Sequence, residues 1–187
     1  MTKMRQGYLE IIIGPMFAGK STKLIEIAGR YESIQKKILA VNHKIDTRYG
    51  ENVISSHNLL KKDCISLEKL TILFDNELYL GAEIVIIEEG QFFSDLKEFI
   101  LRAVDHDKKH VIVAGLIGDY KREPFGDMLT IIPLADSIQT IHAFCKICND
   151  GTPAHFTKRT INKESQQLVG SSESYHPVCR NHYLECS

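Results

Sequence analysis

The segment from Gly14 to Ser21 reads GPMFAGKS and constrains the fold more than any other feature of the chain. It matches the pattern G-x-x-x-x-G-K-[ST] of a phosphate-binding P-loop. The apolar run at 8–13 before it is typical of a buried strand, and residues 22–28 after it have helical spacing. A strand, a glycine loop and a helix N-terminus direct backbone N–H groups and the positive end of the helix dipole toward one point. We therefore predict a P-loop rather than a chance glycine loop.

Two side chains of this loop carry its predicted chemistry. Lys20 is expected to supply a positive charge for the β- and γ-phosphates, and Ser21 a hydroxyl for the Mg²⁺ that accompanies ATP. The residues predicted to bind ATP in this segment are Gly14, Pro15, Met16, Phe17, Ala18, Gly19, Lys20, Ser21 and Thr22.

The composition indicates a soluble globular protein without a nucleic-acid or membrane partner. Of the 187 residues, 43% are apolar and 25% are charged, which is ordinary for such a protein. The 23 basic residues nearly balance the 24 acidic ones, so charge gives no support for binding to nucleic acid or to an anionic membrane. No apolar run approaches about 18 residues, so we expect no transmembrane helix.

The N-terminus weakly resembles a signal peptide, because Lys3 and Arg5 precede an apolar run. Glu10 interrupts that run, however, and the run leads directly into the P-loop, so removing it would destroy the loop. We therefore expect a cytoplasmic protein, whose five cysteines are metal ligands or free thiols rather than disulfides.

Short apolar runs alternate with helical segments along the first part of the chain, which favours an α/β fold with a parallel sheet flanked by helices. The polar segment 44–58 is expected to be an exposed loop or a short strand pair. The expected strands after the first are 38–41, 83–87 and 110–114, and the expected helices are 21–33, 66–74 and 93–104.

The character of the sequence changes near residue 143, where helical periodicity fades and cysteine, glycine and polar residues become frequent. We predict a P-loop ATP-binding α/β domain at 1–142 and a small lobe at 143–187.

Two adjacent carboxylates, Glu88 and Glu89, follow the expected strand 83–87. In P-loop proteins, a carboxylate at the end of a neighbouring strand orients the Mg²⁺ hydration shell. Neighbouring residues of a strand point to opposite faces unless the strand is ending, so the two carboxylates can divide their roles. One can face the metal, and the other can accept a proton from the hydroxyl that attacks the γ-phosphate. The alternative is a solvated acidic loop.

The C-terminal lobe contains a C-x-x-C pair, Cys145 and Cys148, and a C-x-x-H pair, Cys179 and His182. This spacing predicts a tetrahedral Cys₃His zinc site, and the metal would supply folding energy to a lobe with little apolar material. Reduced cysteines without metal are the alternative. Two other residues, His176 and Cys186, compete with His182 as the fourth ligand. Cys64 lies far away in sequence and is expected to be a free thiol.

Together these features resemble the type II thymidine kinases, a family that includes the human cytosolic enzyme. The resemblance extends from about residue 7 to about residue 183. The matching strings are GPMFAGKST at 14–22, DTRYG at 46–50, EGQFF at 89–93, PFG at 124–126, FTKR at 156–159 and YHPVCRNHY at 175–183.

The resemblance implies a RecA-like P-loop core with a zinc-bearing, zinc-ribbon-like lobe. It also implies transfer of the γ-phosphate of ATP to the 5′-hydroxyl of thymidine or deoxyuridine, for nucleotide salvage. Glu89 matches the general base of the family. Asp46, Arg48 and Glu88 are expected beside the metal and the ATP phosphates.

The resemblance further implies a nucleoside pocket and a loop at about 160–175 that covers it. The apolar residues expected around the base and sugar are Phe92, Leu116, Tyr120 and Phe125, and the loop residues expected at the nucleoside are Val169, Gly170 and Tyr175.

Four positions depart from the usual pattern of the family. Glu88 stands where the family usually has Asp, and the additional methylene places its metal role in question. Ile117 removes a carboxylate, and Tyr120 brings a hydroxyl into a pocket that is usually apolar, which could change nucleoside preference. His182 stands where the fourth zinc ligand is often Cys, a replacement that zinc accepts.

The rival prediction is a P-loop ATPase whose zinc lobe binds a macromolecular partner. A zinc-ribbon adaptor with a vestigial P-loop and a kinase for another nucleoside are further alternatives. The family resemblance implies a homotetramer and feedback inhibition by thymidine triphosphate.

Overall fold

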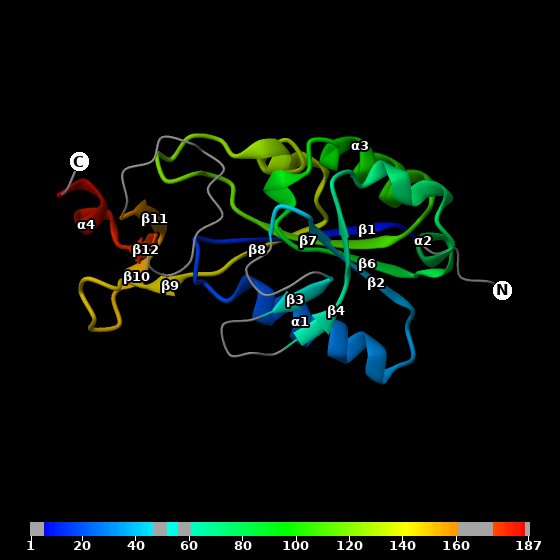
Figure 1. Ribbon diagram of the computed structural model, residues 1–187, viewed down its shortest axis with the longest axis horizontal. Coiled ribbons are helices and arrows are strands. Elements are labelled where there is room, and N and C mark those ends of the chain that lie inside the picture. The colour runs from blue at the N-terminus through cyan, green and yellow to red at the C-terminus, as the bar shows by residue number, and fades with distance from the viewer. Residues whose placement is uncertain (1–5, 47–51, 56–60, 161–173, 186–187) are drawn as a thin grey trace.

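Six parallel strands form the central sheet of the computed structural model, which describes residues 6–46, 52–55, 61–160 and 174–185 (Figure 1). The strand order is β5-β2-β6-β7-β1-β8, with β1 flanked by β7 and β8. The predicted parallel α/β fold is therefore confirmed. The strands are β1 (Tyr8–Ile13), β2 (Ile38–His43), β5 (Ile65–Leu67), β6 (Ile84–Ile87), β7 (His110–Gly115) and β8 (Ser137–Thr140).

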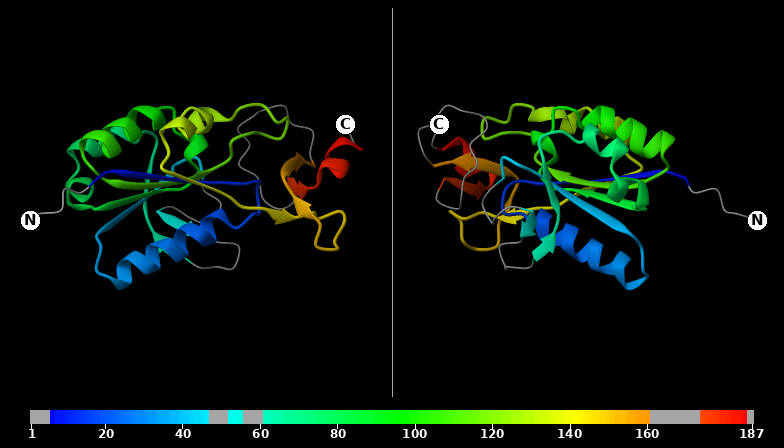
Figure 2. Two further views of the ribbon diagram at one scale, coloured as in Figure 1. Left: turned by 180° about the vertical axis from the view of Figure 1, so that it is seen from behind. Right: turned by 45° about the vertical axis from the view of Figure 1, so that its right-hand side comes forward.

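Helices cover both faces of this sheet (Figures 1 and 2). On one face, α1 (Lys20–Ser33) packs Leu24, Ile27 and Ala28 onto strand residues that include Ile86 and Ile112. The other face carries the larger core, with Phe93, Tyr79 and Phe99 fully buried. Its helical segments are η1 (Thr71–Asp75), α2 (Glu77–Gly81), η2 (Gly90–Phe92), α3 (Leu96–Ile100), the π-helical η3 (Leu101–His106), η4 (Gly126–Leu129) and η5 (Ile132–Leu134).

Short strands form the remainder of the described chain. β3 (Val53–Ser55) and β4 (Lys61–Asp63) form an antiparallel pair on the α1 side of the sheet. The segment 44–58, predicted as an exposed loop or a short strand pair, contains β3, whereas its partner β4 lies beyond it. The C-terminal segment lies at the end of the sheet where β1 leads into the P-loop (Figure 1). Its elements are β9 (Ala143–Phe144), β10 (Pro153–Ala154), β11 (Phe156–Arg159), β12 (Tyr175–Val178) and α4 (Arg180–Leu184).

Three sequence-based assignments differ from the structure. The helix predicted at 66–74 is wrong, because Ile65–Leu67 adds to the sheet edge beside β2 and only a 3₁₀ turn follows. The helix predicted at 93–104 begins at Leu96, because Phe93 is buried in extended backbone before the helix starts. Strand β8 was not predicted, since only one of its four residues, Ile138, is apolar.

No helix within the described ranges is long and apolar enough to cross a membrane.

The turn at Gly126 depends on glycine. Its φ is +54°, and a Cβ at this position would lie 2.1 Å from the backbone oxygen of Gln91. We expect Gly126→Ala to lower the free energy of unfolding by at least about 2 kcal/mol, because left-handed strain adds to a clash with rigid backbone. Denaturant unfolding would measure the loss.

Gly29→Ala is the matched control. Gly29 lies in α1, and no heavy atom lies within 4 Å of the position of the added Cβ. This change is expected to raise stability by about 1 kcal/mol through helix propensity. Equal stability of Gly126→Ala and wild type would contradict the assigned role of the turn.

Candidate active site and metal centre

The P-loop lies between the end of β1 and the start of α1, as its sequence predicts. Lys20 is 8% exposed, and its Nζ donates to the backbone oxygens of Gly14 (3.1 Å) and Pro15 (2.9 Å). The ammonium is thus held across the mouth of the loop. Gly14 is required because a Cβ there would lie 2.4 Å from the backbone oxygen of Ile141.

Ser21 and Glu88 meet although 67 residues separate them. The Ser21 Oγ donates to Oε1 of Glu88 at 2.6 Å, and Glu88 is 3% exposed. Parallel pairing of β6 with β7 and of β7 with β1 brings the two strand ends to one edge. The additional methylene of Glu88 therefore does not carry its carboxylate away from the P-loop hydroxyl.

Glu89, the second residue after β6, adopts a left-handed backbone (φ 52°). Its Oε2 accepts a hydrogen bond from Nε2 of Gln91 at 2.6 Å, and Oε1 of Gln91 accepts one from the backbone N–H of Leu116 at 2.9 Å. The main chain after β7 thus fixes the Gln91 amide, which in turn orients the carboxylate of Glu89. Sequence reasoning did not assign Gln91 a role, although it lies in the EGQFF string.

Asp46 is buried near the end of β2. Its Oδ2 accepts from Nδ2 of Asn42 at 3.2 Å, and its backbone N–H donates to the oxygen of His43. Arg48, the other predicted phosphate-binding residue of the DTRYG string, lies outside the described residues.

The predicted nucleoside residues fall into two contact groups. In the first, the rings of Phe92 and Phe125 meet edge to face with centroids 5.5 Å apart. His43 packs on Phe92, and burial lowers the pKa of its imidazole, so the neutral form is favoured at neutral pH. Leu116 is buried and directly follows β7.

In the second group, Arg159 joins Tyr120 and Tyr175. The guanidinium carbon lies 3.7 Å from the ring centroid of Tyr120, and Nη2 donates to the Tyr175 hydroxyl at 2.6 Å. Sequence reasoning did not assign Arg159 a role. Two further predicted nucleoside residues, Val169 and Gly170, lie outside the described residues.

Two cavities adjoin the P-loop. One, of about 380 Å³, is lined by Gly14 and Pro15 and by Leu116 of the predicted nucleoside set. The other, of about 460 Å³, is lined by Phe17 and Tyr175 together with residues of β9. The P-loop therefore has open space on two sides, and each space also touches a residue predicted to contact the nucleoside.

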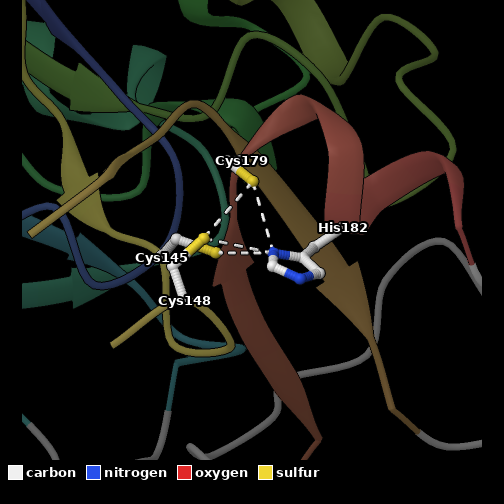
Figure 3. Close-up of side chains that lie close together, drawn as sticks. All are labelled: Cys145, Cys148, Cys179 and His182. Atoms are coloured by element: carbon white, nitrogen blue, oxygen red, sulfur yellow. Dashed lines mark hydrogen bonds between the residues drawn. The ribbon is translucent and has the colours of Figure 1, made fainter. Parts of the chain in front are cut away.

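Cys145, Cys148, Cys179 and His182 converge in the C-terminal lobe (Figure 3). The Cys148 and Cys179 sulfurs lie 3.8 Å apart, and the three sulfurs lie 3.3–3.5 Å from Nδ1 of His182. A tetrahedral zinc ion requires sulfurs about 3.8 Å apart and sulfur–nitrogen separations of about 3.5 Å. The four side chains therefore fit a zinc ion without rearrangement.

The pKa values of two of these thiols are shifted in opposite directions. Burial opposes ionisation of Cys145, but hydrogen bonds from backbone N–H groups and from His182 lower its pKa to about 6. Burial and the neighbouring Cys145 sulfur raise the pKa of Cys148 to about 11. A bound cation would favour both thiolates, the form that binds metal.

Among the described residues, neither His176 nor Cys64 is part of this cluster. Nε2 of His176 lies 3.0 Å from Nζ of Lys146. Burial raises the pKa of the Cys64 thiol to about 11, and Cys64 packs with Ile54 near the β3–β4 hairpin, as predicted for a free thiol. Cys186 lies outside the described residues.

The metal lobe packs directly on the P-loop. Ala18 contacts a small apolar core built from Ala143, Cys145, Ala154 and Val178. The backbone N–H of Met16 donates to Oγ1 of Thr157 at 3.0 Å. Sequence reasoning did not assign a role to Thr157, which the FTKR string contains.

Comparison with known proteins identifies the family of the chain. The family model "Thymidine kinase" matches residues 7–183. This chain belongs to the thymidine kinase family. The predicted family membership is therefore confirmed.

Named relatives agree over nearly the whole chain. A "Thymidine kinase" of Oryza sativa subsp. japonica is 40% identical over 183 residues, which cover 96% of this chain and 67% of that protein. A "Thymidine kinase" of Myxoma virus (strain Uriarra) is 39% identical, covering 97% and 98%. "Thymidine kinase, cytosolic" of Gallus gallus is 34% identical, covering 96% and 78%. These similarities support the predicted thymidine kinase, a phosphotransferase, and do not favour the rival ATPase.

The metal site leads to a direct test. The purified protein is expected to contain one zinc ion per chain, and Cys179→Ser is expected to lose the metal and unfold the lobe, since such sites supply folding energy. Metal analysis combined with limited proteolysis between residues 143 and 185 would measure both effects.

Cys64→Ser is the matched control, because Cys64 lies outside the cluster. It is expected to retain the metal. Full zinc content in Cys179→Ser would remove Cys179 from the ligand set.

Proposed function

We propose that this chain binds Mg-ATP on the P-loop and uses Glu89 as the general base that activates the 5′-hydroxyl of thymidine or deoxyuridine. The observation that carries the proposal is the convergence of Lys20, Ser21, Glu88 and Glu89 at one edge of the sheet, from two different strand ends. In such a site, positioning and charge stabilisation perform most of the catalysis.

The two carboxylates have different surroundings, which supports a division of roles. Glu88 faces the Ser21 hydroxyl, and these two side chains would hold the magnesium ion. The ion supplies charge neutralisation at the phosphates when it is bound. The chain carries Glu instead of Asp here, and its carboxylate still reaches Ser21.

Glu89 is directed toward Gln91 and the start of segment 116–120 instead. A carboxylate that is 9% exposed and held by an amide is suited to accept a proton from a bound hydroxyl. Lys20 and Arg48 would balance the charge on the transferred phosphoryl group, with Asp46 beside them. The apolar residues Phe92, Leu116, Tyr120 and Phe125, with Val169, Gly170 and Tyr175, would enclose the nucleoside.

We expect Glu89→Gln to lower kcat by ~10²–10⁴ while ATP binding is retained, because the amide cannot accept the proton. Steady-state kinetics and equilibrium binding of a nucleotide analogue would separate these effects. Glu98→Gln, on the exposed surface of α3, is the control and is expected to keep full activity. Near-normal turnover by Glu89→Gln would remove Glu89 from the proposed role.

Acceptor preference is tested by offering Mg-ATP with thymidine, deoxyuridine, deoxycytidine and purine deoxynucleosides, and measuring ADP and monophosphate. We expect product from thymidine or deoxyuridine. The absence of product from both thymidine and deoxyuridine would contradict the proposal. ATP consumption that depends on a polynucleotide instead would favour the rival ATPase. Tyr120→Phe, tested on the same panel, would show whether the Tyr120 hydroxyl changes the preference.

Further properties are proposed from the family resemblance. We propose a homotetramer that thymidine triphosphate inhibits by feedback. A cytoplasmic location is supported by the similarity to the cytosolic thymidine kinase of Gallus gallus. The division into a P-loop domain at 1–142 and a zinc lobe at 143–187 is proposed from the change in sequence character near residue 143.

A further inference from the structure

We propose that Arg159 is a positioning residue for the nucleoside pocket, because it holds the Tyr120 ring and the Tyr175 hydroxyl in one arrangement. The inference rests on the proposed function only in placing these two tyrosines at the nucleoside. Arg159 is not proposed to touch the reacting atoms. Its role is to fix the position of aromatic surface that comes from two distant parts of the chain.

The first part of the evidence is strand register. Arg159 ends β11 and lies directly opposite Tyr175, which begins β12, in an antiparallel pair. Directly opposite residues of an antiparallel pair have neighbouring side chains on the same face. Arg159 uses this proximity, because Nη2 and Nε donate to the Tyr175 hydroxyl at 2.6 Å and 3.2 Å.

The second contact is with the α/β core. The guanidinium carbon of Arg159 lies 3.7 Å from the ring centroid of Tyr120, which is a close cation–π distance. Tyr120 follows β7, so this one side chain connects the end of a core strand to the C-terminal lobe. The same guanidinium thus packs on the Tyr120 ring and donates hydrogen bonds to the Tyr175 hydroxyl.

The main chain around Tyr120 is held in place by contacts that do not involve Arg159. Oδ1 of Asp119 accepts from the backbone N–H groups of Lys121 (2.7 Å) and Glu123 (3.0 Å). The Tyr183 hydroxyl donates to the backbone oxygen of Tyr120 at 2.8 Å. The main chain at Tyr120 is therefore fixed by other residues, and the ring itself is contacted by Arg159 at 3.7 Å and more distantly by Nζ of Lys121 at 5.6 Å from its centroid.

The contacts require arginine rather than lysine. A guanidinium can stack on a ring and donate in its own plane at the same time, whereas an ammonium is a compact point charge. A guanidinium only donates hydrogen bonds, so the Tyr175 hydroxyl must accept from it. The hydroxyl proton of Tyr175 is therefore directed away from Arg159.

The experiment measures thymidine kinetics and thymidine affinity for Arg159→Met. We expect KM and Kd for thymidine to rise about tenfold, the order of losing a cation–π contact and a charge-assisted hydrogen bond. The kcat and the KM for ATP should stay within about threefold, because binding is lost equally in the ground and transition states. Arg159→Lys should recover only part of the thymidine affinity.

Arg180→Met is the matched control. Arg180 lies in the same lobe, with its guanidinium carbon 4.8 Å from the Phe156 ring centroid, and no described contact joins it to Tyr120 or Tyr175. It is expected to leave thymidine KM unchanged. An equal rise in both arginine variants, or loss of zinc from Arg159→Met, would show a general structural role and overturn the proposal.

A double-mutant cycle with Tyr120→Leu tests whether the effect passes through the ring. If it does, Arg159→Met adds much less in the Tyr120→Leu background than in the wild type. If the effects of the two substitutions on thymidine KM simply multiplied in the double variant, the proposal would be overturned. An unchanged thymidine KM in folded Arg159→Met would also overturn it. Thymidine affinity measured by calorimetry does not require turnover. If the wild-type protein failed to transfer phosphate, that result would count against the proposed function, whereas the comparison of thymidine affinity between wild type and Arg159→Met would still test the role of Arg159.

Discussion

The parallel pairing of β1, β7 and β6 is the constraint on which the site depends. Residues at the ends of these strands pair in register, Ile13 with Gly115 and Ile87 with Val113. Parallel strands have their carboxyl ends at one edge of a sheet, where α/β proteins bind their ligands. The P-loop, the carboxylates of Glu88 and Glu89, and the chain that follows β7 from Leu116 therefore meet at this edge. The hydrogen bond between Ser21 and Glu88 is a local consequence of this register.

The metal lobe completes that edge. Ala18 of the P-loop packs in the same small core as Cys145, so a candidate zinc ligand and the P-loop share their packing. Thr157 and Tyr183 add hydrogen bonds to Met16 and to the Tyr120 backbone. A zinc ion bound by the cluster would therefore be coupled to both halves of the proposed site, since the lobe that it would stabilise contacts the P-loop and the segment after β7.

Sequence alone predicted the parts of this arrangement that depend on local pattern. The P-loop and the cysteine spacing each combine residues close in sequence, and the buried strands are continuous apolar runs. The helix predicted at 66–74 was wrong, because pairing with β2 outweighs local propensity at Ile65–Leu67. Gln91 and Arg159 were not assigned roles, because their functions depend on contacts with Leu116 and Tyr120 that only the tertiary fold creates.

Backbone strain gives a physical reason why two consecutive carboxylates can act separately. In an extended strand, Glu88 and Glu89 would point to opposite faces. Glu89 instead has a left-handed backbone, which costs roughly 1 kcal/mol for a residue with a Cβ. The turn lets both carboxylates be buried at one strand end, Glu88 toward Ser21 and Glu89 toward Gln91. Such strain persists only where surrounding contacts over-determine it, and here the paired strands and the Gln91 amide provide those contacts.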